Sequence, residues 1–101
     1  MQIAENDKKV LVEIVSCLDT FAEARHFTSF DIVGHATYQD SVRLVLESIA
    51  QSGVSILQEG KSFLTAIRNA KAMHWAILGD SAFISAVLEY LDAARAALAD
   101  N

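Results

Sequence analysis

Proline is absent from the 101 residues, and glycine occurs only four times. Turns in all-β domains rely on these two residues, so their scarcity argues against an all-β fold. Sixteen alanines favour helices, because alanine is the best helix former and glycine is among the poorest. Apolar residues reach 52% of the chain, which excludes a disordered segment and leaves surplus apolar surface for contact with another chain. The composition predicts an all-α protein, and the length predicts a single domain over residues 1–101.

Cysteine is equally scarce, since Cys17 is the only one, and we expect it to be a small buried hydrophobe. Basic residues are outnumbered, with 8 Lys+Arg against 13 Asp+Glu and a formal net charge of −5. Such a chain has no general attraction for nucleic acid or for an anionic membrane. The sequence lacks the basic-then-apolar order of a signal peptide, and no apolar run approaches the ~20 residues of a membrane-spanning helix. We therefore expect a soluble, cytoplasmic protein without membrane contact.

Apolar residues recur at helical spacing in four long segments. These segments cover residues 6–24, 37–58, 62–77 and 81–99. Between the first two, the capping-box spacing of Thr28 and Asp31 predicts one short extra helical turn that ends at Gly34. Short connections make neighbouring helices antiparallel. The sequence thus predicts an up-and-down four-helix bundle with a short extra turn between the first and second helices.

Two glycines bear on the boundaries of the second helix. Gly60 is expected to end it. Gly53 lies inside it at a cost of about 1 kcal/mol relative to alanine, so it either breaks the helix or permits the close approach of another backbone. Candidate N-caps, whose side chains accept from free backbone N–H groups, are Asn6, Asp7, Asp80 and Ser81.

The net charge conceals one basic segment. Residues 61–79 carry a formal charge of +3, whereas residues 1–24, 25–36, 37–60 and 80–101 carry −3, 0, −2 and −3. The basic residues are Lys61, Arg68 and Lys71, and no acid lies among them. If the protein contacts phosphate or RNA, the contact is therefore expected on the third helix.

The run from Arg68 to His74 holds the residues on which a metal-free ribonuclease depends. Arginine offers a planar fork of donors that matches phosphate oxygens, and histidine transfers protons near neutral pH. We expect Arg68 and His74 to be catalytic, with Asn69 and Lys71 binding the substrate. On one ideal helix Arg68 and His74 are about 240° and 9 Å apart, so they do not share a face. A homodimer with this helix at its two-fold interface would bring the residues of two copies together.

An arginine, a polar residue and a histidine shortly afterwards, here Arg68-Asn69 and His74, resemble the signature of the HEPN superfamily. The wider pattern resembles its HepT-like branch, with a Phe-containing turn at residues 27–30 before the Gln39-x-x-Val42 helix. This resemblance implies a small helical bundle in a toxin–antitoxin system, which cleaves RNA or binds nucleotides beside a nucleotidyltransferase partner. The chain departs from the branch in the five residues between Arg and His, and in Ala76, which replaces the tyrosine that the partner modifies with AMP.

Simpler interpretations of these residues stay open. Arg68 and Lys71 also suit a solvated face that pairs with acidic neighbours, and His74 suits a hydrogen bond across the bundle. The spacing of His26 and His35 matches no trusted ligand set, so no metal or other cofactor is expected. The alternative function is that of a non-enzymatic helical adaptor, which binds a protein partner through an exposed apolar stripe.

Overall fold

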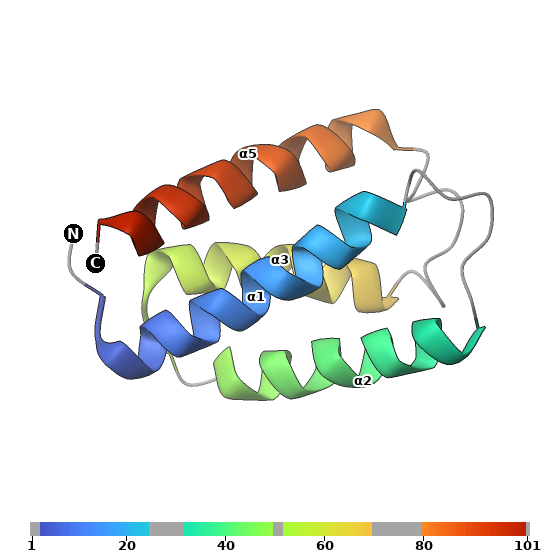
Figure 1. The fold of residues 1–101 in the computed structure, drawn as a ribbon, viewed down its shortest axis with the longest axis horizontal. Helices are drawn as coiled ribbons and strands as arrows, with labels where there is room; N and C mark the ends of the chain where they lie inside the picture. Colours follow the sequence, from blue (N-terminus) through green and yellow to red (C-terminus); the bar gives the residue numbers. More distant parts are fainter. Residues whose placement is uncertain (1–2, 25–31, 50–51, 70–79, 101) are drawn as a thin grey trace.

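The computed structural model describes residues 3–24, 32–49, 52–69 and 80–100. These residues form four α-helices and no strand: α1 (Glu5–Ala24), α2 (Ile32–Ile49), α3 (Ser55–Asn69) and α5 (Ser81–Ala99). Successive helices run in opposite directions, as Figure 1 shows. The predicted all-α fold and up-and-down four-helix bundle are confirmed. The extra turn predicted around Thr28 and Asp31 lies outside the described residues.

Helices α1 and α3 are central to the packing, because each of them contacts the other three helices. Helix α3 lies behind α1 in Figure 1, and α2 and α5 flank this pair on opposite sides. The start of α1, the end of α5 and the connection from α2 to α3 share one end of the bundle. The last turn of α3, which carries Arg68 and Asn69, lies at the other end.

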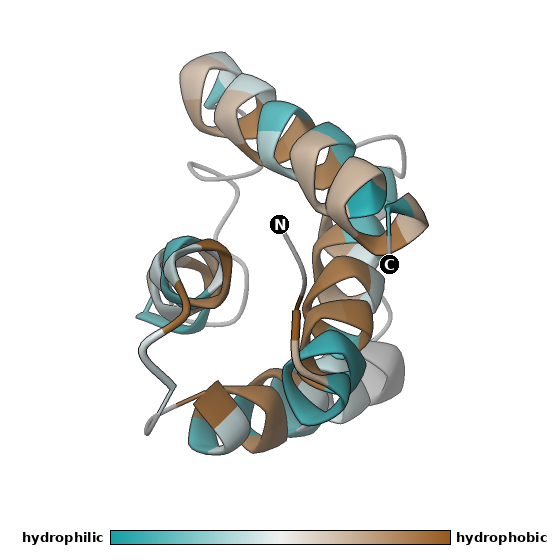
Figure 2. Cartoon of the chain, turned by 90° about the vertical axis from the view of Figure 1, so that its left-hand side faces the viewer, coloured by the Kyte–Doolittle hydropathy of each residue, from teal (hydrophilic) through white to brown (hydrophobic). Residues whose placement is uncertain are grey.

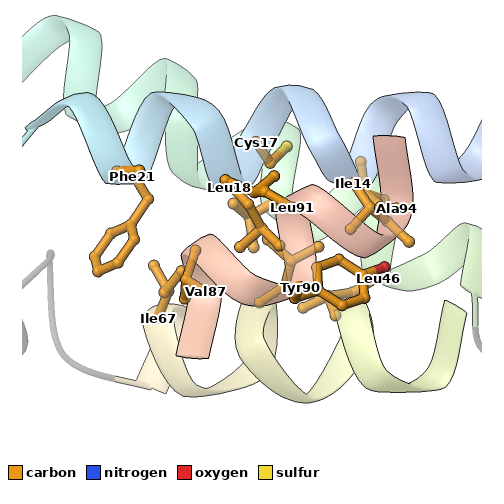
Figure 3. Close-up of a cluster of buried hydrophobic side chains, with 14 of the residues drawn as sticks. Ile14, Cys17, Leu18, Phe21, Leu46, Ile67, Val87, Tyr90, Leu91 and Ala94 are labelled. Carbon is orange, nitrogen blue, oxygen red and sulfur yellow. The ribbon is translucent and has the colours of Figure 1, made fainter. Parts of the chain in front are cut away.

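The core is apolar throughout the described residues, where no buried polar or charged residue occurs. Viewed along the bundle, each helix alternates between hydrophobic and hydrophilic residues around a shared interior (Figure 2). The largest fully buried side chains are Phe21, Leu11, Ile14, Leu18, Ile49, Leu57, Leu64, Ile67, Leu91, Val42 and Val87. Figure 3 shows how side chains from all four helices meet in this cluster. Burial of this apolar surface is the main stabilising contribution to the bundle.

Aromatic rings connect three of the helices near the α5 side of the core. Phe83 packs edge-on against Phe21, with ring centroids 5.7 Å apart, and against Phe63 at 5.9 Å. Phe63 also contacts Tyr90 at 5.5 Å. Edge-to-face pairs at these distances add stabilisation beyond the area that the rings bury.

The N-cap prediction is confirmed for the last helix and wrong for the first. The Asp80 carboxylate accepts a hydrogen bond of 3.1 Å from the backbone N–H of Phe83 and so caps α5. Helix α1 begins one residue earlier than expected, at Glu5. Asn6 and Asp7 therefore lie in its first turn, where the acidic side chain of Asp7 favours the positive end of the helix dipole.

The predicted second helix over residues 37–58 is wrong as one continuous helix, and the alternative that Gly53 breaks it is confirmed, because Gly53 lies in the non-helical segment 52–54 between α2 and α3. Helix α2 already contains Gly34, and it ends at Ile49. The N–H of Ser52 donates to the Ile49 carbonyl at 2.8 Å, and the Ser52 hydroxyl accepts from the N–H of Val54 at 3.2 Å. The side-chain amide of Gln58 donates to the carbonyls of Ile49 and Ser52, so it connects α3 to the end of α2 and to the segment between the two helices.

Gly60 does not end a helix; it lies buried inside α3. A Cβ atom at this position would lie 2.5 Å from the hydroxyl oxygen of Tyr90 and 2.7 Å from Cγ2 of Ile14. At Gly53, by contrast, a Cβ atom would meet nothing within 4 Å. The close approach considered for Gly53 is absent there. At Gly60 the absent side chain instead lets side chains of α1 and α5, and not another backbone, pack against α3.

Candidate functional site

Arg68 and Asn69 are the last two residues of α3, and both are exposed. Lys71 and His74 lie outside the described residues. The third helix starts at Ser55 and not at Ser62 as expected, and its described part ends at Asn69. The structure therefore places half of the predicted site, at the end of the bundle remote from the α2–α3 connection.

Helical spacing extends this half-site into a longer surface. Lys61, Thr65 and Arg68 are four and three residues apart, and Asn69 follows Thr65 by four, so these residues share one side of α3. We call this surface the α3 polar face; it consists of Gln58, Lys61, Ser62, Thr65, Arg68 and Asn69. It lies away from the buried side of the helix, which carries Leu57, Gly60, Leu64 and Ile67. A shallow hollow of about 570 Å³ lies along it, lined by Gln58, Lys61, Ser62, Thr65, Ala66 and Asn69.

Two members of the α3 polar face have structural roles. The amide of Gln58 holds the α2–α3 connection, as described above. The hydroxyl of Ser62 donates to the Gln58 carbonyl at 3.2 Å, within its own helix. The described ion pairs join Arg43 to Glu47 and Arg95 to Asp19, so neither cation of the α3 polar face takes part in them. Lys61, Thr65, Arg68 and Asn69 are therefore the members that present donors to solvent.

Because α3 starts at Ser55, it includes one acidic residue, Glu59, whose charge does not neutralise the α3 polar face. Glu59 was absent from the expected third helix but belongs to the observed one. Its carboxylate acts on Tyr90, whose pKa is raised above the ordinary value by burial and, secondarily, by the negative charge of Glu59. The acidic side chain thus influences the α5 side of the helix.

The four donors suit the binding of phosphate groups. Arginine supplies a fork of N–H groups, lysine a compact positive charge, and the hydroxyl and amide add directional donors. Lys61 and Arg68 are two turns apart, which corresponds to about 10 Å along the helix axis. In its described part, the face holds no histidine or carboxylate that would transfer a proton near neutral pH. Binding is within reach of these residues, and cleavage would depend on His74.

Sequence reasoning found the two cations and Asn69 but missed Thr65. The signal was present, because Lys61, Thr65 and Asn69 follow one another at intervals of four. This spacing did not identify Thr65, because the helix was expected to begin at Ser62 and Lys61 was therefore assigned to the preceding connection.

The described part of the chain contains neither a reactive cysteine nor a metal centre. Cys17 is buried, as predicted, and the pKa of its thiol is raised by burial and by the nearby Glu13 carboxylate. A raised pKa keeps the sulfur protonated and poorly nucleophilic at neutral pH. Among the described residues, no cluster of His, Cys, Asp or Glu has the geometry of a metal site. None of the described helices combines the length and apolar character needed to span a membrane.

Comparison with protein-family models, with curated proteins and with solved structures finds no match.

Proposed function

We propose that this protein is a HEPN-like, cytoplasmic RNA-binding bundle that holds RNA on the α3 polar face and cleaves it without a metal ion. The observation that carries the proposal is the exposure of Arg68 and Asn69 on the last turn of α3, on the same side as Lys61 and Thr65. This arrangement provides positive charge and hydrogen-bond donors along two turns of an otherwise acidic protein.

The proposed roles follow from the chemistry of each side chain. Arg68 binds the phosphate and stabilises the charge that develops on it, while Asn69 and Lys71 position the substrate. His74 takes the proton of a ribose 2′-hydroxyl, whose oxygen then attacks the neighbouring phosphorus. The bond from phosphorus to the 5′-oxygen breaks, and that oxygen receives a proton as it leaves. The products are a 2′,3′-cyclic phosphate and a 5′-hydroxyl end.

The proposal extends to partners. By the HEPN resemblance, the physiological partner is a nucleotidyltransferase in a toxin–antitoxin pair, and the active form is a homodimer. If the α3 polar face serves nucleotide binding in place of cleavage, the same residues would hold the nucleotide phosphates. A cleavage assay and a nucleotide-binding assay on the same variants distinguish these activities.

The test is incubation of the purified protein with RNA in the presence of a metal chelator. We expect cleavage by the wild type and its loss in the Arg68→Ala and His74→Ala variants, which should keep the helical content of the wild type. Arg95→Ala, which removes an exposed arginine on α5, is the matched control and should cleave normally. Wild-type behaviour of the Arg68/His74 double variant in RNA-cleavage, RNA-binding and nucleotide-binding assays would rule out the proposal.

A second candidate function, that of a helical adaptor, is favoured by exposed apolar side chains. Val12 on α1 is 51% exposed and Leu44 on α2 is 54% exposed, both on helices that take no part in the α3 polar face. An adaptor would lose its partner on substitution of these residues and would be indifferent to Arg68 and His74.

A further inference from the structure

The α3 polar face contains two parallel rows of side chains, because residues four positions apart form a ridge along a helix. We call the first row the donor row; it consists of Lys61, Thr65 and Asn69. The second row consists of Gln58, Ser62 and Ala66. Both rows line the shallow hollow of about 570 Å³. A ligand in this hollow would therefore contact both rows at once.

The second row offers few donors to a ligand. The Ser62 hydroxyl donates to the Gln58 carbonyl at 3.2 Å, and the Gln58 amide donates to the carbonyls of Ile49 and Ser52. Ala66 contributes only a methyl group. The donor row differs, because none of its side chains takes part in a hydrogen bond or ion pair with the rest of the described chain. An anionic group is therefore favoured on the donor row, and an uncharged part of the same ligand on the second row.

The spacing of the donor row matches the backbone of a nucleic-acid strand. Its neighbouring members are four residues apart, which corresponds to about 6 Å along the helix axis. Successive phosphates of one RNA strand are joined through a single ribose, and their separation is close to the length of one helical turn. In a nucleoside triphosphate the phosphorus atoms are joined through one oxygen and lie much closer together. The donor row thus fits consecutive phosphates of a strand better than the phosphates of a single nucleotide.

Arg68 strengthens the last position of the donor row. It precedes Asn69 directly, and both residues are exposed on the last turn of α3. A guanidinium group binds a phosphate through two parallel hydrogen bonds, whereas Thr65 supplies one neutral donor and Lys61 a point charge. The phosphate at Arg68 and Asn69 is therefore held most firmly. Phosphates at Thr65 and then at Lys61 are added as the strand lengthens.

We propose that one strand of RNA lies along α3 with three consecutive phosphates on the donor row. The first phosphate contacts Arg68 and Asn69, the second Thr65 and the third Lys61, and the riboses lie toward the second row. This inference rests on the proposed RNA-binding function and names its substrate class. The ligand is a single-stranded oligonucleotide with at least three phosphates, and not a mononucleotide. Because the contacts are to phosphates, binding is independent of the base sequence.

Competition binding with oligouridylates of defined length tests the proposal on the full chain. The competitors carry one, two or three phosphates and displace a longer labelled strand at low salt, in the presence of a metal chelator. Their riboses are 2′-O-methylated, so they lack the hydroxyl that cleavage requires. The affinity of the wild type should rise about fivefold with each added phosphate. UTP carries three phosphates on one nucleotide and should bind about tenfold more weakly than the competitor with three phosphates.

Substitutions along the donor row should act in order of position. Arg68→Ala should weaken the binding of all three competitors, Thr65→Val only of those with two or three phosphates, and Lys61→Ala only of that with three. Each effect should be about fivefold. Thr20→Val makes the same change at an exposed hydroxyl on α1; it is the matched control and should leave every affinity unchanged. Circular dichroism checks that the helices of each variant persist.

Two different results would contradict the proposal. If Arg68→Ala weakens the binding of no competitor, the RNA-binding function itself is wrong. If Arg68→Ala weakens binding but Lys61→Ala acts equally on all three competitors, phosphate binding at Arg68 holds and the arrangement along the donor row is refuted. UTP that binds as tightly as the competitor with three phosphates would refute the same arrangement.

Discussion

The hydroxyl group of Tyr90 on α5 occupies the space that a side chain at position 60 of α3 would need. From there it donates a hydrogen bond of 2.8 Å to the backbone carbonyl of Ile56, one turn earlier in α3. Figure 3 shows the ring of Tyr90 among the buried side chains that join the two helices. Helix α5 is thus fixed to α3 by a tyrosine that fits only because residue 60 is glycine.

Gly60→Ala should destabilise the protein by about 1–2 kcal/mol. The added methyl group overpacks the contact with Tyr90 and Ile14, a change that costs about 1–3 kcal/mol, while alanine recovers about 0.5–1 kcal/mol of helix propensity. Urea denaturation measures the difference. Gly53→Ala is the matched control, because its methyl group meets open space, and its effect should stay within about 0.5 kcal/mol. Equal effects at the two positions would contradict the close packing described for Gly60.

Tyr90→Phe should change how stability depends on alkaline pH. The folded pKa of Tyr90 is raised, first by burial and then by Glu59, so the unfolded chain releases this proton at lower pH than the folded one. The contribution of the tyrosine is therefore fully present below its ordinary value near 10 and is lost as the pH rises above it. At neutral pH the variant should be less stable by about 1 kcal/mol, because the hydrogen bond to Ile56 is lost. Above pH 10 its stability should decline less steeply than that of the wild type, and parallel denaturation profiles would be the contrary result.

Asp80→Ala should destabilise the protein by about 1 kcal/mol, because it removes the side-chain acceptor that caps α5 at the N–H of Phe83. Thermal denaturation at neutral pH measures the difference from the wild type. Asp100→Ala, at the opposite end of the same helix, is the control. Its negative charge lies at the negative end of the helix dipole, so its removal should be neutral or slightly stabilising.

Lys61→Ala should weaken RNA binding uniformly across sequences if the α3 polar face holds the phosphate backbone. A plot of log K against log salt should lose about 0.7 of slope for each single-strand phosphate contact removed. Fluorescence anisotropy with a labelled single-stranded RNA measures this slope. A variant with weaker binding and an unchanged slope would show that Lys61 supports the face without contacting phosphate.

The fold was predictable because its determinants are local and periodic. Apolar residues at helical spacing located four helices, and α5 was predicted with its bounds and with Asp80 as one of two candidate caps. The boundary between α2 and α3 was wrong because Gly60 was expected to end a helix, whereas the break considered at Gly53 does occur. Gly60 is in a helix because tertiary packing with Tyr90 and Ile14 outweighs the low helix preference of glycine, and no local pattern contains this information.

Only part of the candidate site was predicted, because the start of the third helix was placed too late in the sequence. Arg68 and Asn69 were singled out by residue type, and the structure adds Thr65 and the alignment with Lys61 once α3 begins at Ser55. An exposed apolar stripe was expected, but the sequence did not show which residues it would contain. The structure identifies Val12 and Leu44 as exposed apolar side chains.

Four antiparallel helices bring the beginning of α1 and the end of α5 to one end of the bundle (Figure 1). A short linker across that end would close the chain into a ring, and Gly53, exposed in the α2–α3 connection, offers a place to reopen it. Such a circularly permuted chain would start at α3 and finish with α2, with the core residues unchanged. Fluorescent labels attached just before α1 or just after α5 would likewise lie far from the last turn of α3 and leave its exposed arginine unobstructed.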